Sequence, residues 1–209
     1  MRIAIHANPS LAHQLEHAQW WKSGLSRHGI TPEICHAPTC SADLHIISGP
    51  YFCNEYLSCG HNVIMIDRCF YRGDPSNVAV NWLDSDGNKL YRSGAGREPP
   101  EVTSRPVGSR TIYLADYGGG IEPADTVRRH PADEAPTESL FDALDRHDIA
   151  IGYSSTALVK AALMGLKTMV RDKNHILNQK NWLNLLPYSD WHKSEIESGK
   201  TWEFLSQWA

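Results

Sequence analysis

Residues 149–167 have the sequence IAIGYSSTALVKAALMGLK, in which an apolar run, a polar turn and a second apolar run follow one another. The pattern predicts a buried strand over 148–153, then a turn, then a helix over 157–164 that Gly165 ends. A further strand is predicted over 167–171. Strand, helix and strand in this order indicate two parallel strands joined by a helical crossover.

The same alternation extends toward the N-terminus. Short apolar runs predict further strands, with helices between several of them. Because strands that alternate with helices usually pair in parallel, we predict an α/β fold. The predicted strands cover 3–6, 31–36, 43–48, 62–67, 78–83, 111–116 and 126–130.

Residues 93–109 interrupt this alternation. Their sequence, SGAGREPPEVTSRPVGS, is dominated by Gly, Pro and Ser and is typical of a linker. We therefore expect two small lobes, over 1–95 and 106–209, with a cleft between them. The last segment, 178–209, holds four tryptophans at helical spacing. It is predicted to be an amphipathic helical tail that packs across a lobe or pairs with a second copy in a homodimer.

The composition limits the classes of function. A net charge of −4 does not favour unassisted nucleic-acid binding, which usually needs a basic surface. No run reaches the roughly 18 apolar residues of a spanning helix, and the N-terminus does not resemble a secretion signal. We expect a cytoplasmic protein with no membrane partner. The five cysteines contain no Cys-x-x-Cys pair, which favours free thiols over a metal site.

The polar turn before the helix is the strongest candidate for chemistry. Unpaired amides at a helix N-terminus bind phosphate, and Ser154, Ser155 and Thr156 add three hydroxyls. The alternative is that one of the serines simply caps the helix. Capping accounts for one hydroxyl and leaves two without a role.

Two further segments are expected beside this turn. His130 follows Arg128 and Arg129 at the end of a short strand, and this group offers positive charge and N–H donors to an anion. A solvated basic turn is the alternative. Gly118 and Gly119 let a ligand approach the backbone closely, or form a plain turn. Ligands bind open α/β sheets at the carboxyl ends of the strands, where all these residues are predicted to lie.

Residues that end strands are also the candidates for a catalytic base, because a carboxylate or an imidazole can take the proton of a hydroxyl. Asp67 closes an apolar strand; a cap or an ion pair with Arg68 or Arg72 is its alternative. His6 closes the first strand and is equally well explained as a buried structural histidine. Asp116 ends the first strand of the second lobe and is a third candidate.

The order of motifs over about 126–171 resembles the nucleotide-binding half of GT-B glycosyltransferases, in their small bacterial and phage branch. His130-Pro131 matches the His-Pro motif of this family, and Ser154-Ser155-Thr156 matches its later Ser/Thr motif. The resemblance implies two Rossmann-like lobes. It also implies that His130 and residues 154–156 hold the donor phosphates and that the acceptor binds in the N-terminal lobe.

The resemblance implies the activity as well. Such an enzyme moves a sugar from a nucleotide-sugar donor to a hydroxyl of a small molecule or, in a phage-type enzyme, of a hydroxymethylated DNA base. No cofactor or metal is required, because the helix dipole and His130 can neutralise the leaving diphosphate. Two alternatives stay open: a sugar-nucleotide epimerase on the same scaffold, and a non-catalytic nucleotide- or DNA-binding module.

Overall fold

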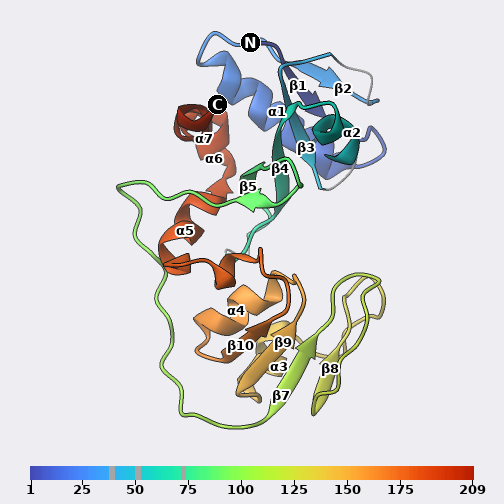
Figure 1. The fold of residues 1–209 in the computed structure, drawn as a ribbon, viewed down its shortest axis with the longest axis vertical. Helices are drawn as coiled ribbons and strands as arrows, with labels where there is room; N and C mark the ends of the chain where they lie inside the picture. Colours follow the sequence, from blue (N-terminus) through green and yellow to red (C-terminus); the bar gives the residue numbers. More distant parts are fainter. Residues whose placement is uncertain (38–40, 50–52, 72–73) are drawn as a thin grey trace. The chain divides into compact units, whose positions relative to one another are not determined.

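The computed structural model describes the whole chain except residues 38–40, 50–52 and 72–73 (Figure 1). The chain divides into two compact units, each with its own sheet. Unit 1 contains Met1–Arg97 and Pro187–Ala209, and unit 2 contains Glu98–Leu186. This grouping differs from the predicted lobes, because the end of the chain belongs with the N-terminal residues and not with residues 106–186.

Unit 1 is built on a seven-stranded sheet with the order β11-β5-β4-β3-β1-β2, in which β6 also pairs with β5. Strands β1 to β4 pair in parallel, whereas β5 is antiparallel to β4, β6 and β11. The strands are β1 (Ile3–His6), β2 (Glu33–Cys35), β3 (Leu44–Ser48), β4 (Asn62–Arg68), β5 (Asn77–Leu83), β6 (Lys89–Leu90) and β11 (Asp190–His192).

The predicted parallel pairing is therefore wrong for β5. A parallel partner requires a crossover of a dozen or more residues, usually a helix. The connection between β4 and β5 is shorter than that, and its described part holds no helix. The chain therefore reverses direction, and β5 runs back along β4.

Helices cover both faces of the unit 1 sheet (Figure 1). Helices α1 (Ala12–Ser26), α6 (Lys193–Glu197) and α7 (Lys200–Leu205) pack on one face, and α2 (Cys53–Ser58) packs on the other. Successive residues of a strand point to opposite faces. Ile46 accordingly joins the core under α1, while Ile47 packs with Tyr56 of α2. Burial on both faces explains why these strands are almost wholly apolar.

The predicted helical tail is helical in separate short segments, with a strand between them. It contains α5 (Trp182–Ser189), β11, α6, α7 and the 3₁₀ helix η2 (Ser206–Trp208). Pro187 lies inside α5, and the next residues add a strand to the sheet beside β5. Trp191, Trp202 and Leu205 are buried in the unit 1 core. The part of the tail from Pro187 onward belongs to unit 1 and packs on its core, which is one of the two arrangements expected, whereas residues up to Leu186 belong to unit 2.

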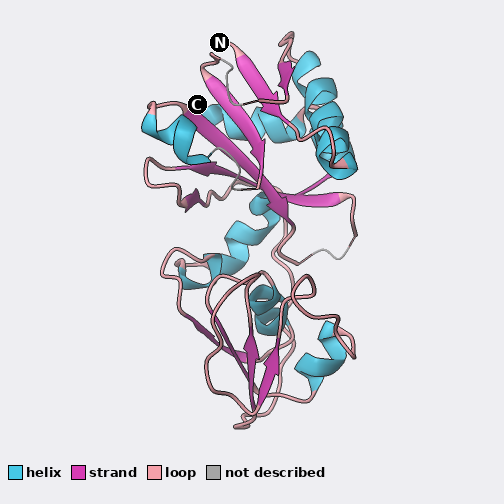
Figure 2. Cartoon of the chain, turned by 90° about the vertical axis from the view of Figure 1, so that its right-hand side faces the viewer, coloured by secondary structure: helices cyan, strands magenta, loops and turns pink. Residues whose placement is uncertain are grey.

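Unit 2 contains a four-stranded, wholly parallel sheet with the order β10-β9-β7-β8 (Figure 2). Ile112, Leu114 and Ala150 of the sheet pack against Leu144 of α3 and Leu158 of α4. Its elements are β7 (Thr111–Leu114), β8 (Thr126–Arg128), α3 (Leu140–Asp145), β9 (Ile149–Gly152), α4 (Ala157–Leu163), β10 (Lys167–Val170) and the 3₁₀ helix η1 (Ile176–Asn178).

The predicted linker, residues 93–109, has no helix or strand. Its second part runs along unit 2, where the amide of Thr103 donates to the carbonyl of Leu163 at 2.8 Å. A Cβ at Gly165 would lie 2.1 Å from the Thr103 carbonyl oxygen. The glycine that ends α4 therefore also lets the linker pass close to the helix.

The cysteines differ in part from the prediction of free thiols. Cys35, at the end of β2, is disulfide-bonded, whereas Cys59 and Cys69 form no disulfide. A disulfide needs two Cα atoms about 4.4–6.8 Å apart with suitable side-chain directions. The fold decides which cysteines satisfy this condition, and their spacing in the sequence does not.

Candidate functional site

The unit 2 sheet brings the predicted donor-binding residues to one edge. The segments that follow its parallel strands lie at the carboxyl ends of those strands: Tyr117–Gly119 after β7, His130 after β8, and Ser154–Thr156 after β9. Strand β7 lies between β8 and β9. The glycine turn is therefore the neighbour of both the histidine and the hydroxyl turn.

Asp116 holds the first residue of the hydroxyl turn. The amide of Ser154 donates to Asp116 Oδ2 at 2.9 Å, and the Ser154 hydroxyl donates to the same oxygen at 3.2 Å. The Ser154 donors, predicted to be available to a phosphate, are thus occupied by a carboxylate. Gly119 donates its amide to the Asp116 carbonyl at 3.0 Å. Asp116 therefore fixes two turns at this edge through its carboxylate and its carbonyl.

Ser155 and Thr156 differ in how their hydroxyls are used. Ser155 Oγ accepts from the amide of Ala157 at 3.3 Å, as the capping alternative predicts for one serine. Thr156 has helical φ and ψ and makes no capping hydrogen bond through its side chain. Both side chains are half-buried. Of the three hydroxyls, that of Thr156 is the one not committed to the turn or the helix cap.

His130 presents a defined ring nitrogen at the same edge. The amide of Ala132 donates to His130 Nδ1 at 3.1 Å, so the proton of the neutral ring is on Nε2, which is a donor. The Tyr117 ring lies edge-on to the imidazole with centroids 5.6 Å apart. Gly118 has a φ of 62°, the left-handed region, and donates to Asp133 Oδ2 at 3.0 Å. The glycine is thus needed to form the turn.

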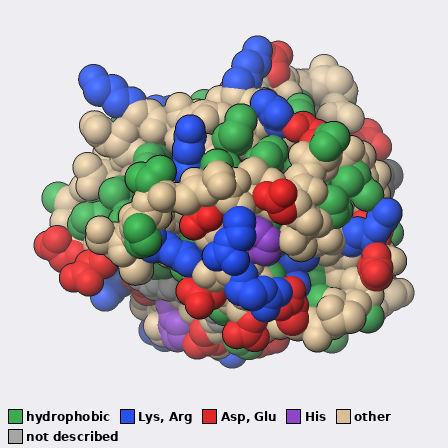
Figure 3. Space-filling view, turned by 90° about the horizontal axis from the view of Figure 1, so that it is seen from below, with side chains coloured by type: hydrophobic (Ala, Val, Ile, Leu, Met, Phe, Trp, Pro, Cys, Tyr) green, Lys and Arg blue, Asp and Glu red, His purple; other side chains and the backbone are tan. Residues whose placement is uncertain are grey.

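The arginines of this edge are engaged with acidic partners or carbonyls. Arg129 pairs with Glu134 at 3.2 Å, and Arg128 donates to the carbonyl of Glu138 at 3.1 Å. Seen from below, the molecule presents a face on which basic and acidic side chains are interspersed (Figure 3). Arg128 and Arg129 therefore offer an anion less charge than the sequence suggests, which leaves His130 as the main polar group after β8.

Asp67, one of the three candidates for the catalytic base, is engaged at both carboxylate oxygens. Lys89 lies 2.8 Å from Oδ2, and the amide of Arg68 donates to Oδ1 at 2.7 Å. Of the two arginines named as ion-pair alternatives, Arg72 lies outside the described residues. An ion-paired carboxylate that already accepts two donors is poorly suited to take a proton from a substrate.

His6, another candidate for the base, lies in a buried cluster with His45 and Tyr56. Its Nε2 is 2.9 Å from His45 Nδ1, and the Tyr56 hydroxyl is 3.1 Å from its Nδ1. The Tyr56 ring stacks on that of His45 with centroids 3.9 Å apart. Burial, and secondarily the nearby His45, lowers the pKa of His6 to about 4. His6 is therefore neutral at pH 7, and both of its ring nitrogens are already in hydrogen bonds.

A cavity of about 180 Å³ lies beside His6, at the carboxyl ends of β1, β2 and β3. In open α/β sheets, ligands bind where the strand order reverses direction, and β1 between β2 and β3 is such a point. The volume is below the roughly 300–1,000 Å³ of pockets for drug-sized ligands, so it suits a group of one ring. The lining residues are His6, Ala7, Asn8, Pro9, Gln14, Cys35, His36, Ile47 and Ser48.

His36 is a functional candidate that the sequence did not single out. Its Nδ1 lies 2.8 Å from the carbonyl oxygen of Ala7. A carbonyl can only accept, so Nδ1 carries the proton and Nε2 of the neutral ring is an acceptor. The side chain is exposed and lines the cavity. One signal was available: His36 ends the strand predicted over 31–36, just as His6 ends the first.

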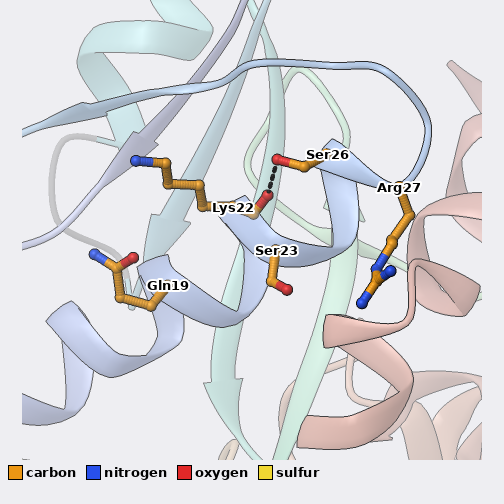
Figure 4. A pocket seen from close by; sticks show the side chains of 5 residues that line it. All are labelled: Gln19, Lys22, Ser23, Ser26 and Arg27. Atoms are coloured by element: carbon orange, nitrogen blue, oxygen red, sulfur yellow. Dashed lines mark hydrogen bonds between the residues drawn. The ribbon is translucent and has the colours of Figure 1, made fainter.

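A second, wider hollow of about 500 Å³ runs along α1 and its C-terminal end (Figure 4). Its lining side chains come from one helix and the residue after it, and all are exposed. The Ser26 hydroxyl donates to the carbonyl of Lys22 at 2.7 Å, within the helix itself. We assign no chemistry to this surface. The lining residues are Gln19, Lys22, Ser23, Ser26 and Arg27.

The histidine cluster predicts a dependence of stability on pH. The pKa of His6 is lowered to about 4, and that of His45 is also lowered, in both cases mainly by burial. An unfolded histidine has a pKa near 6.5. Between these values the unfolded chain binds more protons than the folded one, so stability is lost as the pH falls. For His6 alone, the free energy of unfolding should be about 2 kcal/mol lower at pH 5 than at pH 7.5.

Urea denaturation at pH 7.5 and pH 5, followed by circular dichroism, measures this difference. A His6→Gln variant should be less stable than wild type at pH 7.5, because it loses buried hydrogen bonds. Its additional loss at pH 5 should be smaller by about the 2 kcal/mol assigned to His6. An acid-induced loss of equal size in both proteins would contradict the assignment.

Comparisons with known proteins give a distant structural likeness and no match to a family model or a curated protein. Among solved structures, the chain is similar to KpsC of Thermosulfurimonas dismutans, a beta Kdo 2,7 transferase. The TM-score is 0.46 and the sequence identity is 9%, over 81% of this chain and 78% of that one. The protein is an α/β protein with a mixed, mainly parallel sheet in unit 1 and a parallel sheet in unit 2, and the likeness to this transferase is distant.

The described residues also bear on membrane and metal sites. None of the helices in the described part of the chain is long and apolar enough to cross a membrane. Within the same residues, no three or more His, Cys, Asp or Glu side chains gather in a way that suits a metal ion. The groups on which the proposals below rest are the hydrogen-bonding side chains at the two sheet edges.

Proposed function

We propose that the protein is a glycosyltransferase that moves a sugar from a nucleotide-sugar donor to a hydroxyl acceptor. The observation that carries the proposal is the set of polar groups at the carboxyl edge of the unit 2 sheet. His130 Nε2–H and the Thr156 hydroxyl are donors from strands on either side of β7. In this proposal, the donor diphosphate binds at this edge, and the acceptor binds in the unit 1 cavity.

The contacts of Asp116 favour some of the polar groups over others as phosphate ligands. An anion at the Ser154 amide would compete with the Asp116 carboxylate, which already accepts from that amide and hydroxyl. We therefore assign the diphosphate to His130, Thr156 and the Ser155 hydroxyl, with Ser154 as a positioning residue. Gly118 and Gly119 shape the turn that lets the ligand approach. Hydrogen bonds to a charged group contribute about 1.5–3 kcal/mol each, enough for two or three donors to govern affinity.

Exposed aromatic rings at the same edge support a nucleotide as ligand. Tyr117 follows β7 and is 71% exposed, and Tyr153 follows the neighbouring β9 and is 56% exposed. Large aromatic side chains are usually at least partly buried, and an exposed ring offers a face on which a planar base can stack. The two tyrosines immediately adjoin the glycine turn and the hydroxyl turn.

The acceptor is best explained as a small molecule that carries hydroxyls. A hydroxymethylated DNA base would bring its phosphate backbone, which binds to basic surfaces. The net charge is −4, so the chain has no overall excess of positive charge for such a backbone. An epimerase would need available acid and base carboxylates, whereas Asp67 and Asp116 are engaged in ion pairing or hydrogen bonds. That engagement favours a second candidate, a nucleotide-binding module without catalysis.

Calorimetric titration of nucleoside diphosphates tests the donor site. His130→Ala and Thr156→Val should each weaken binding of the best diphosphate about tenfold or more, because each removes a donor to a charged group. Ser154→Ala should have a smaller effect, since its hydroxyl already serves Asp116. Ser139→Ala is the matched control: Ser139 caps α3 by accepting from the amide of Asp142. Equal affinities in wild type, His130→Ala and Thr156→Val would refute the site.

Turnover separates the two candidate functions. Release of nucleoside diphosphate from a nucleotide-sugar, dependent on an added hydroxyl compound, would identify the transferase. Binding that responds to His130→Ala and Thr156→Val, without any such release over a panel of donors and acceptors, would identify the binding module.

A further inference from the structure

The cavity of unit 1 has the polarity of a site for an uncharged ligand. Its lining contains no Asp, Glu, Lys or Arg among the described residues. The polar groups that line it are amides, a hydroxyl and imidazoles, and His6 is kept neutral by its burial. Hydroxyl groups of a sugar or another polyol match such a lining, whereas a phosphate or a carboxylate would find no fixed charge to offset its own.

The wall of the cavity is held in one arrangement before any ligand binds. The amide of Ala7 donates to the carbonyl of Cys35 at 3.0 Å, which continues the pairing of β1 with β2. Gln14, a buried side chain of α1, accepts from the amide of Asn8 at 2.8 Å. The Ala7 carbonyl that orients His36 is thus itself fixed. A site that is organised in advance loses less free energy when its ligand binds.

His36 has the features of a general base in this setting. Its Nδ1–H is satisfied by the Ala7 carbonyl at 2.8 Å, which fixes both the tautomer and the orientation of the ring. Its Nε2 therefore carries the lone pair, on an exposed side chain that lines the cavity. His6 lacks this property, because both of its ring nitrogens are engaged with His45 and Tyr56.

We infer that the cavity at the ends of β1, β2 and β3 binds an uncharged, hydroxyl-bearing ring and that His36 Nε2 takes the proton of its reacting hydroxyl. The inference rests on the proposed transferase function for the chemical step, but the binding site stands without it. In that step the acceptor oxygen bonds to the anomeric carbon of the donor sugar. The bond from that carbon to the diphosphate oxygen breaks, its electron pair leaves with the diphosphate, and the hydroxyl proton passes to His36 Nε2.

Two substitutions at His36 distinguish the hydrogen bond that Nδ1 makes to Ala7 from the basicity of Nε2. In His36→Asn, the amide nitrogen replaces Nδ1–H toward Ala7, and nothing replaces Nε2. In His36→Gln, the side-chain amide reaches the place of Nε2 as a hydrogen-bonding group that is not a base. His13→Gln, an exposed histidine of α1, is the matched control.

Binding is measured first, by two-dimensional NMR titration of the ¹⁵N-labelled full chain with uncharged polyols: methyl hexosides, inositol and glycerol. We expect the amide signals of Ala7, Asn8, His36 and Ser48 to shift with at least one member, and glucose 6-phosphate to shift them less. His36→Gln should keep the affinity within about threefold, and His36→Asn should lower it further. A panel in which no uncharged member shifts these signals, or in which the sugar phosphate binds best, would overturn the inference.

Turnover is measured second, with the acceptor identified by the titration. His36→Gln should lower the rate by about 10²–10⁴-fold, the usual contribution of a general base, without changing nucleoside diphosphate affinity. His13→Gln should leave both unchanged. Full turnover by His36→Gln would overturn the role of His36 as base. If polyols bind at the cavity while diphosphates fail to bind anywhere, the proposed transferase fails and the cavity site stands.

Discussion

Replacing Trp191 with alanine is expected to lower the free energy of unfolding of unit 1 by about 3–5 kcal/mol, the usual cost of truncating a buried tryptophan. The side chain is 2% exposed and belongs to the main core of the unit. Its ring centroid lies 3.8 Å from the Arg97 guanidinium carbon, and its Nε1 donates to the Tyr188 carbonyl at 3.0 Å. Alanine leaves a cavity beside β11 and removes both contacts.

The tail offers a matched control in Trp208. This tryptophan is 46% exposed and contacts Phe204 and Arg92 at the end of the chain. Trp208→Ala should cost about 1 kcal/mol or less, as exposed substitutions usually do. Urea denaturation followed by far-ultraviolet circular dichroism measures both variants. Losses of the same size would mean that the tail does not form part of the unit 1 core.

The alternation of short apolar runs was sufficient to locate most strands of both sheets. Strand β4 spans Asn62–Arg68 where 62–67 was predicted, and β9 spans Ile149–Gly152 within 148–153. Such runs indicate that a strand is buried on both faces of the sheet, as the central strands of an α/β sheet are. They do not report direction, and so the antiparallel course of β5 was not predicted.

The tail shows where periodicity misleads. Helical spacing of its tryptophans predicted an amphipathic helical tail, but Asp190–His192 form a strand beside β5. Three residues are too few to show a period of two, and Pro187 just before them was the local sign of an interruption. Assignment of the tail to unit 1 depends on contacts such as the one from Trp82 Nε1 to the Leu205 carbonyl, 3.1 Å long, between residues far apart in the chain.

The candidate sites were predictable to the extent that they follow from parallel strands. The carboxyl ends of such strands meet at one edge, so Ser154–Thr156, His130 and Gly118 were expected together, and the sheet of unit 2 places them so. Their pairwise contacts were not predictable. The bond from Ser154 to Asp116 and the ion pair of Lys89 with Asp67 join side chains of different segments, and these depend on register and side-chain direction.

The strand register also bears on the two interpretations of His6, a catalytic base or a buried structural histidine. Ala4 pairs with His45 across β1 and β3, and His6, two residues along, lies on the same face of the sheet as Ala4. The two imidazoles therefore meet on the face covered by α2, where Tyr56 closes over them. A strand-end histidine in sequence becomes a buried, neutral one in the fold, while His36, at the end of the next strand, keeps an exposed ring.

Replacing Gly24 with alanine is expected to destabilise unit 1 by about 3 kcal/mol, the upper end of the usual cost of overpacking. A Cβ at this position would lie 1.9 Å from the Ile196 carbonyl oxygen of α6. The obstacle is backbone, so no side chain can rotate away, and α6 or α1 must move. Alanine favours a helix interior by about 1 kcal/mol over glycine, which offsets only part of the steric cost.

A substitution at the neighbouring Ser23 of α1 distinguishes the steric clash from the gain in helix propensity. Ser23 is exposed, so Ser23→Ala adds helix propensity without any clash and should leave stability unchanged or slightly higher. Urea denaturation compares the two variants, and amide exchange of α6 shows whether the clash acts there. Gly199, which precedes α7, also lies at this contact, and its Cα would be 3.4 Å from the alanine Cβ at position 24. If Gly24→Ala were as stable as Ser23→Ala, α1 and α6 would not be packed backbone to backbone, and the docking of the tail on α1 would be wrong.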